Sequence, residues 1–168
     1  EALMKAHCDT TRIDAHGVNN LYGLQRLMFR GIVEGGEVLA RRRPRDGRDR
    51  LPLPFQIEVL EPEFLDDRHT GELANRNRTY DGIEFDALGR RVAYQIYREH
   101  PEGRSFDTLF ESSRVTAANV VHALRVDRPN QFRGVPWLAP VMMRLADAQD
   151  YADAQLLKQK ISALYVGF

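Results

Sequence analysis

The chain contains 168 residues, of which 43% are hydrophobic and 29% are charged, a composition typical of a soluble globular protein of one or two small domains. Its 24 basic and 24 acidic residues cancel, so no overall field draws it to nucleic acid or to an anionic membrane, and any polyanion contact has to be local. The single cysteine, Cys8, excludes an internal disulfide framework, and with five scattered histidines it also excludes a cysteine-rich zinc module.

We expect a soluble, cytoplasmic chain. No apolar run approaches the roughly 20 residues that span a bilayer, and the N-terminus lacks the basic-then-apolar pattern of a signal peptide. The sequence starts at Glu1 without an initiator methionine and ends in an apolar stretch at 161–168. Because ordinary termini lie in water, these ends favour a piece of a longer protein over a native C-terminal helix that docks on its own core.

The first predicted helix runs from about Val18 to Val33. Its apolar stripe repeats at three- and four-residue spacing and consists of Leu21, Leu24, Leu27, Met28 and Ile32. Gly35 and Gly36 end this helix, and a strand is predicted to follow from Glu37 to Arg42.

An arginine-rich segment comes next, and its residues 43–50, with proline and glycine, predict an exposed loop. Six arginines stand against Asp46 and Asp49, a local net charge of +4 (6 − 2); they are Arg41, Arg42, Arg43, Arg45, Arg48 and Arg50. Phosphate contact is one interpretation. A solvated loop, or pairing with acidic residues of a neighbouring subunit, is an equal alternative.

The middle of the chain predicts strands. Residues 55–59 alternate between apolar and polar, the period of a half-buried strand, whereas residues 66–81 are polar and predict a mobile loop. A hairpin is predicted next, with Ile83 and Phe85 on one strand, Gly89 in the turn, and Val92, Tyr94 and Ile96 on the return strand. Residues 120–126 predict another strand, and residues 128–134 a loop that leads out of it.

Three acidic residues, Asp81, Glu84 and Asp86, are candidate ligands of a divalent metal, because Glu84 and Asp86 are expected on one strand face. A metal-dependent nuclease would use such a cluster. The alternative is that they are solvent-side residues of a strand whose other face is buried. His7 and Cys8 lack a second pair at metal-ligand spacing, and no phosphate loop, nucleophile elbow or zinc-protease motif is present. We therefore expect no enzyme, no metal and no cofactor.

Beyond Pro136 the sequence predicts one helix to the end of the chain. Its expected apolar stripe consists of Leu138, Met142, Leu145, Tyr151, Leu156, Ile161 and Leu164. Three aspartates at 147–153 precede Lys158 and Lys160, the order that the helix dipole favours. Trp137, between Pro136 and Pro140, is expected to pack where this helix meets the strand-rich region.

Four segments in order resemble the lambda-type phage portal proteins. The family's helix and following turn are similar to residues 24–27 and 34–39, and its hairpin to residues 81–86 and 89–94. Its most diagnostic segment resembles residues 120–122 and 128–140, and the helix at 150–160 continues the match. The resemblance runs from about Asp14 to Phe168, and the loop at 68–78 is not matched.

The resemblance implies a fold of class α+β, with a strand-rich clip region between two stem helices. It assigns residues 1–16 to the remnant of a wing segment, 17–36 to the first stem helix, 37–132 to the clip, and 133–168 to a truncated second stem helix. In the second helix Arg144, Lys158 and Lys160 would line the channel. The clip–stem junction would consist of Arg133, Gly134, Pro136 and Trp137.

The resemblance also implies a structural role. Portal subunits form a ring, usually of twelve copies, at one capsid vertex of the virion, and they assemble in the bacterial host cytoplasm. The implied partners are the other copies, the terminase large subunit, head–tail connector proteins, and double-stranded DNA that passes through, with no membrane. Zero net charge suits a conduit, because every fixed phosphate contact would slow sliding DNA. The alternative function is a nucleic-acid-binding module that uses the Arg41–Arg50 segment.

Overall fold

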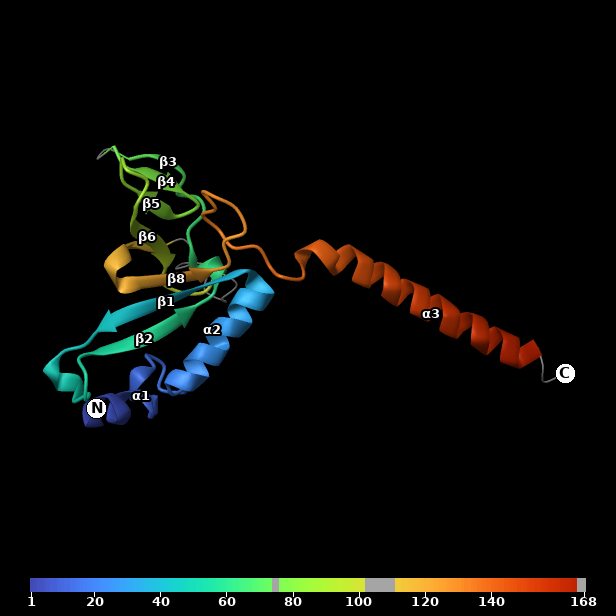
Figure 1. Ribbon diagram of the computed structural model, residues 1–168, viewed down its shortest axis with the longest axis horizontal. Coiled ribbons are helices and arrows are strands. Elements are labelled where there is room, and N and C mark those ends of the chain that lie inside the picture. Colours follow the sequence, from blue (N-terminus) through green and yellow to red (C-terminus); the bar gives the residue numbers. More distant parts are fainter. Residues whose placement is uncertain (74–75, 102–110, 166–168) are drawn as a thin grey trace.

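The computed structural model describes residues 1–73, 76–101 and 111–165. Within these ranges the helices are α1 (Ala2–Cys8), α2 (Leu21–Gly35) and α3 (Met142–Tyr165). The strands are β1 (Glu37–Pro44), β2 (Phe55–Leu60), β3 (Gly71–Glu72), β4 (Arg78–Tyr80), β5 (Ile83–Phe85), β6 (Arg91–Tyr97), β7 (Ser112–Thr116) and β8 (Val120–Leu124). Figure 1 shows α1 and α2 beside the strands and α3 extending away from them. Along the chain, helices precede and follow the strand-rich middle, and the predicted α+β class is confirmed.

The strands form two antiparallel sheets. The first has the order β2-β1-β8, and in it Leu39 lies opposite both Leu60 and His122. The second has the order β3-β4-β5-β6-β7. Its central hairpin is the predicted one: Ile83 pairs with Tyr94, and Gly89 has a φ of +76°, a conformation that glycine adopts without strain.

The first sheet lies between α1 and α2 on one side and the second sheet on the other. Directly opposite residues of an antiparallel pair share a face. One face of the first sheet, with Leu39 and Leu60, packs against Ile83, Tyr94 and Ile96 of the second sheet. The other face packs under the N-terminal helices, in a cluster formed by Cys8, Ile13, Leu21, Leu24, Phe55, Ile57 and Val59.

Helix α2 begins three residues later than the apolar pattern predicts. The carboxylate of Asp14 accepts backbone hydrogen bonds from His16, Val18 and Asn19, which holds this segment in a non-helical turn. Asn20 then caps the helix by accepting the N–H of Gly23. Sequence periodicity does not report such a competing turn, so the prediction placed Val18 inside the helix.

The structure corrects two predictions for the strand-rich middle of the chain. The segment at 66–81, expected to be a loop, contains β3 and β4, which pair with each other and extend the hairpin sheet. Strand β7 was not predicted, because only Val115 in it is both apolar and buried. Both errors have the same cause: β3, β4 and β7 are only two to five residues long and carry almost no apolar alternation of their own.

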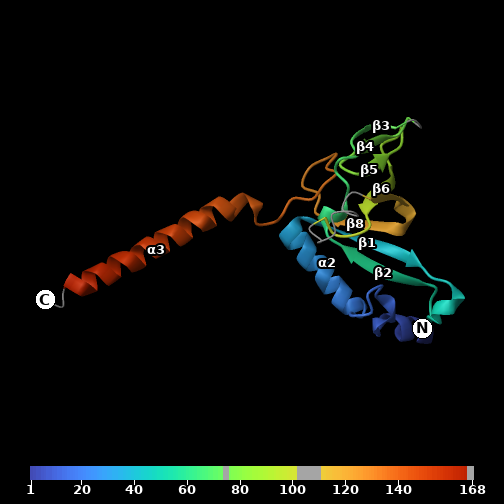
Figure 2. The same ribbon diagram turned by 180° about the vertical axis from the view of Figure 1, so that it is seen from behind.

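Helix α3 extends away from both sheets, and Figures 1 and 2 show its C-terminal end far from the rest of the molecule. The α-helix starts at Met142 rather than directly after Pro136, because a 3₁₀ turn at Ala139–Val141 precedes it. Its residues are exposed except for the half-buried Gln155, as far as Leu164. The part of the predicted helix at 166–168 lies outside the described residues.

Candidate functional site

A buried carboxylate, Glu37, joins three segments that are distant in the sequence. It opens β1 and is 2% exposed. Its side chain accepts hydrogen bonds from His122 Nε2 on β8, at 3.0 Å, from Arg133 Nε and from the backbone N–H of Gly134. A carboxylate only accepts hydrogen bonds, so the His122 hydrogen sits on Nε2. We call these four residues the Glu37 site.

The Glu37 site holds a charge away from water. Burial raises the pKa of Glu37, but the hydrogen bonds from His122, Gly134 and Arg133 outweigh burial, and the pKa lies below its ordinary value. The ionised carboxylate is therefore stable at neutral pH, where Arg133 compensates its charge. Losing Glu37 would leave buried donors without an acceptor.

The segment from Arg125 to Val141, which we call the linker, runs from β8 to α3. The side chain of Gln131 closes its first turn by donating to the carbonyls of Arg125 and Arg133. The predicted junction residue Trp137 donates its backbone N–H to the carbonyl of Val33, at 3.2 Å, and its ring meets Phe29 of α2 edge-on at 6.1 Å. The ring is 38% exposed, so it is a partly covered contact between the linker and α2.

Glycines allow the linker to touch the end of α2. Gly36 has a φ of +86°, and a Cβ there would lie 2.5 Å from the carbonyl carbon of Val135 and 2.6 Å from the nitrogen of Pro136. A Cβ on Gly134 would overlap the carbonyl of Gly36. All four residues predicted for the clip–stem junction thus lie in or beside this contact. Their role at a clip–stem junction stays a prediction that rests on the family resemblance.

The three basic residues proposed to line a channel do not share one face of α3. Arg144, Lys158 and Lys160 are all exposed. At 100° per residue, Arg144 and Lys158 lie within about 40° of each other, whereas Lys160 lies on the opposite side. A single channel-facing surface can therefore include Arg144 and Lys158 but not Lys160.

The exposed apolar residues of α3 also divide between two sides. One side carries Leu145, Ala152, Leu156 and Ala163, and the other carries Met143, Leu157, Ile161 and Leu164. The single stripe predicted from the sequence is wrong, because the continuous helix places Ile161 and Leu164 away from Leu145. Two exposed apolar sides need two partners, and the described residues contain none for either.

The arginine-rich segment is not one exposed loop, because β1 continues through Pro44 and includes its first three arginines. Arg43 pairs with Glu58 of β2 at 2.9 Å, Arg41 approaches the same carboxylate at 3.9 Å, and Arg45 donates to Gln56. Three arginines of the set remain exposed with no strong ion pair among the described residues: Arg42, Arg48 and Arg50. The surface charge is therefore smaller than the sequence count suggests.

The acidic cluster predicted for a metal is not assembled. Glu84 is fully buried rather than solvent-facing, and its carboxylate accepts from Asn77 and Arg114. Asp86 accepts from Arg90, and Asp81 lies 3.9 Å from Arg133. Each carboxylate is thus directed to a different arginine, because β5 is covered on both faces. This geometry contradicts the predicted strand face and the nuclease hypothesis built on it.

Two other residue sets bear on metal binding. His7 and Cys8 are buried, and His7 meets the Phe55 ring edge-on at 5.1 Å. Within the described ranges, the ligand-type atoms that come together in a group of three belong to Glu61, Glu63 and His100, and the two glutamates are exposed.

Sequence reasoning also missed the buried carboxylate of Asp66. It accepts two hydrogen bonds from Arg68 and one from the Tyr97 hydroxyl at 2.9 Å, and it lies 3.0 Å from His69 Nδ1. Burial raises the pKa of Asp66, yet hydrogen bonds from Arg68, Ser112 and Tyr97 hold it well below its ordinary range. These contacts of Asp66 hold the beginning of the 66–81 segment, which was predicted to be a mobile loop, against β6. No local pattern reveals these contacts, since Tyr97 lies 31 residues away.

Comparison with known proteins gives a consistent result. A family model described as "Phage portal protein, lambda family" matches residues 1–168. The chain is 30% identical, over 116 residues, to a "Probable portal protein" of Halomonas phage phiHAP-1. That alignment covers 68% of this chain and 22% of the relative, so the chain spans about a fifth of the relative's length. None of the described helices is long and apolar enough to cross a membrane.

Proposed function

The chain belongs to the lambda family of phage portal proteins, and from that premise we propose that it forms the stem and clip of a portal subunit. The family is structural and non-enzymatic, and its members are virion components that assemble as rings on the capsid. We infer that residues 17–36 and 133–168 are the stem, 37–132 the clip, and 1–16 the end of a wing segment. DNA enters and leaves the capsid through the ring.

Helix α3 is the observation that carries this proposal. Its 24 residues make no packing contact with either described sheet, although both of its apolar sides contain leucine. Exposed apolar surface of this extent marks an interaction site. Rings are built from head-to-tail contacts that close by rotation, so each helix has a neighbour on both sides. A helix with two apolar sides fits that position.

Electron microscopy of the full-length subunit tests the proposal. We expect rings from the wild type and loss of most rings when Leu145 and Leu156 are both changed to aspartate, because both substitutions put charge into one helix contact. The matched control is Ser162→Asp, on the polar side that also carries Arg144 and Lys158, and it should still form rings. A wild type that stays monomeric, or a double variant that assembles normally, would contradict the proposal.

We also propose that the exposed arginines of the Arg41–Arg50 segment dock an acidic surface of the terminase large subunit or of a connector protein. Arginine's planar fork binds carboxylates in a bidentate manner. Arg42, Arg48 and Arg50 can be removed without breaking the pairs that Arg41 and Arg43 make with Glu58. Changing these three residues to alanine should weaken docking of the motor protein to the full-length ring about tenfold or more, with little change in duplex affinity.

Duplex DNA at two salt concentrations provides the comparison. If all six arginines contacted phosphates, the affinity for duplex DNA would fall steeply as the salt concentration rises. Because Arg41 and Arg43 pair with Glu58, we expect a shallow dependence instead. If the wild type binds duplex tightly with a steep salt dependence that the triple variant loses, while motor docking is unchanged, the segment is a phosphate clamp. The nucleic-acid-binding function would then be the correct one.

A further inference from the structure

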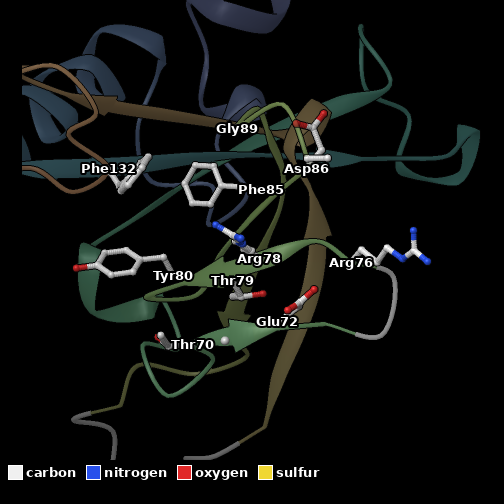
Figure 3. Close-up of a pocket in the computed structure, with 12 residues that line it drawn as sticks. Thr70, Glu72, Arg76, Arg78, Thr79, Tyr80, Phe85, Asp86, Gly89 and Phe132 are labelled. Carbon is white, nitrogen blue, oxygen red and sulfur yellow. The ribbon is translucent and has the colours of Figure 1, made fainter.

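A hollow of about 740 Å³ opens beside the linker, on the sheet that β3 to β7 form. Its lining residues come from β3, β4, β5, the β5–β6 turn and Phe132 of the linker, with Thr70 before β3 and Arg76 between β3 and β4. Figure 3 shows Phe85, Tyr80 and Phe132 gathered on one side, with Arg78 extending toward Phe85 between them. The volume lies in the range of sites that take a small molecule or a few residues of a peptide.

Three aromatic rings form an apolar wall in this hollow. The Phe132 ring packs on Phe85 at 4.7 Å and on Tyr80 at 5.8 Å. Phe132 is still 36% exposed and Tyr80 49% exposed, so the cluster presents ring surface to solvent. Because the rings hold one another in place, and the β strands are rigid, a ligand here would meet a preformed surface.

Two arginines, Arg76 and Arg78, and two carboxylates, Glu72 and Asp86, line this hollow. Glu72 lies opposite Arg78 in the register of β3 and β4, but the two side chains form no ion pair. No hydrogen bond or ion pair holds the guanidinium of Arg78 to any described residue. The nearby Asp86 is already satisfied, because it accepts from Arg90 Nε at 2.8 Å and from the backbone N–H groups of Leu88 and Arg90. Arg91 is likewise engaged, donating to the Phe132 carbonyl. Arg78 therefore remains available to an acceptor that enters from outside.

We propose that this hollow binds an acidic peptide segment of a protein that docks on the ring, with a large apolar side chain against Tyr80 and Phe132 and a carboxylate on Arg78. This inference rests on the proposed function, which puts the sheet in the clip. Arginine and aromatic residues are the commonest anchors of protein interfaces, and a guanidinium beside an apolar wall pairs strongly with a carboxylate.

Duplex DNA does not match this chemistry. Its bases are stacked in pairs, so it presents phosphates to a protein surface but no apolar group that could enter the aromatic side of the hollow. Single-stranded nucleic acid does offer bases that stack on aromatic rings, and it is therefore the competing ligand to be tested.

A ligand in the hollow would also contact the linker, because Phe132 lines the hollow. Phe132 precedes Arg133 of the Glu37 site, and its carbonyl accepts from Arg91 of β6. A ligand that packs on Phe132 thus touches the segment that fixes where α3 begins.

Fluorescence anisotropy with two labelled pentapeptides tests the proposal on the 168-residue chain. The probe has a central phenylalanine between pairs of aspartates, and the second peptide has asparagines instead. We expect the acidic probe to bind at least about tenfold more tightly than the asparagine peptide, and Arg78→Gln or Tyr80→Ala to weaken it by a similar factor. The matched control is Arg26→Gln, an exposed arginine of α2 outside the hollow, which should change nothing.

Thermal melting of each variant shows whether the fold is intact. Arg78→Lys provides a second variant, which keeps the positive charge but lacks the planar guanidinium group. Equal binding by wild type and Arg78→Gln would overturn the proposal. So would equal binding of the two peptides, or an oligothymidine that binds more tightly than the acidic probe. The ring assay is independent of all these readouts: rings without peptide binding reject only this inference, whereas a monomeric full-length wild type rejects the proposed function.

Discussion

Replacing Gly134 with alanine is expected to lower the free energy of unfolding by about 3 kcal/mol or more, beyond the usual cost of overpacking. The added Cβ would overlap the carbonyl oxygen and carbon of Gly36 and would lie 2.7 Å from Cβ of Glu37. These neighbours are backbone atoms or stiffly held, so no flexible side chain can move aside. The linker would have to separate from the end of α2, and the hydrogen bond from Gly134 N–H to Glu37 would be lost with it.

The matched control is Gly47→Ala, because a Cβ at Gly47 meets nothing within 4 Å and its φ is not positive. Urea denaturation of the two variants beside the wild type measures the difference. Gly47→Ala should stay within about 0.5 kcal/mol of the wild type, as surface substitutions usually do. If Gly134→Ala is as stable as Gly47→Ala, the close approach of linker and α2 described here does not exist.

Changing Glu37 to alanine should cost about 3–5 kcal/mol, the usual effect of removing one partner of a buried ion pair. His122, whose side chain is 1% exposed, would keep a buried N–H with no acceptor, and Arg133 would lose its counter-charge. The comparison is Glu34→Ala, which removes an exposed pair with Arg30 on α2 and should cost less than about 1 kcal/mol. Equal melting temperatures of the two variants would contradict the role assigned to Glu37.

The pH dependence of the free energy of unfolding tests whether the charge of Glu37 causes this stabilisation. Its pKa in the folded chain is below the ordinary value of 4.5, so ionisation stabilises the folded state above that pH. The stabilisation is lost as pH falls through the lowered folded pKa. The stability difference between wild type and Glu37→Gln should therefore be largest at neutral pH and shrink below pH 4.5. A difference that does not change with pH would assign the loss to packing instead.

Local patterns in the sequence were reliable where one element carries its own signal. The hairpin at β5 and β6 was predicted because alternating apolar residues flank Gly89, and α2 because Leu24 and its neighbours repeat at helical spacing. The family resemblance, which rested on ordered motifs, is confirmed by a match over residues 1–168. These features depend on residues within a few positions of one another.

The tertiary structure decided every feature that depends on a distant partner. Glu84 reads as a solvent-side residue of a strand, but Arg114 of β7, 30 residues away, makes it a buried acceptor. Arg41 and Arg43 read as part of a charged loop, but the register of β1 on β2 places Glu58 beside them.

The sequence by itself determined the α+β order, the family and the apolar content of α3. Only the tertiary structure showed that Glu37 binds His122 and Arg133, 85 and 96 residues away, and that α3 has two exposed sides. The physical reason is that periodicity records which residues avoid water, whereas hydrogen-bond partners are chosen by how the sheets pack and by where the linker crosses α2.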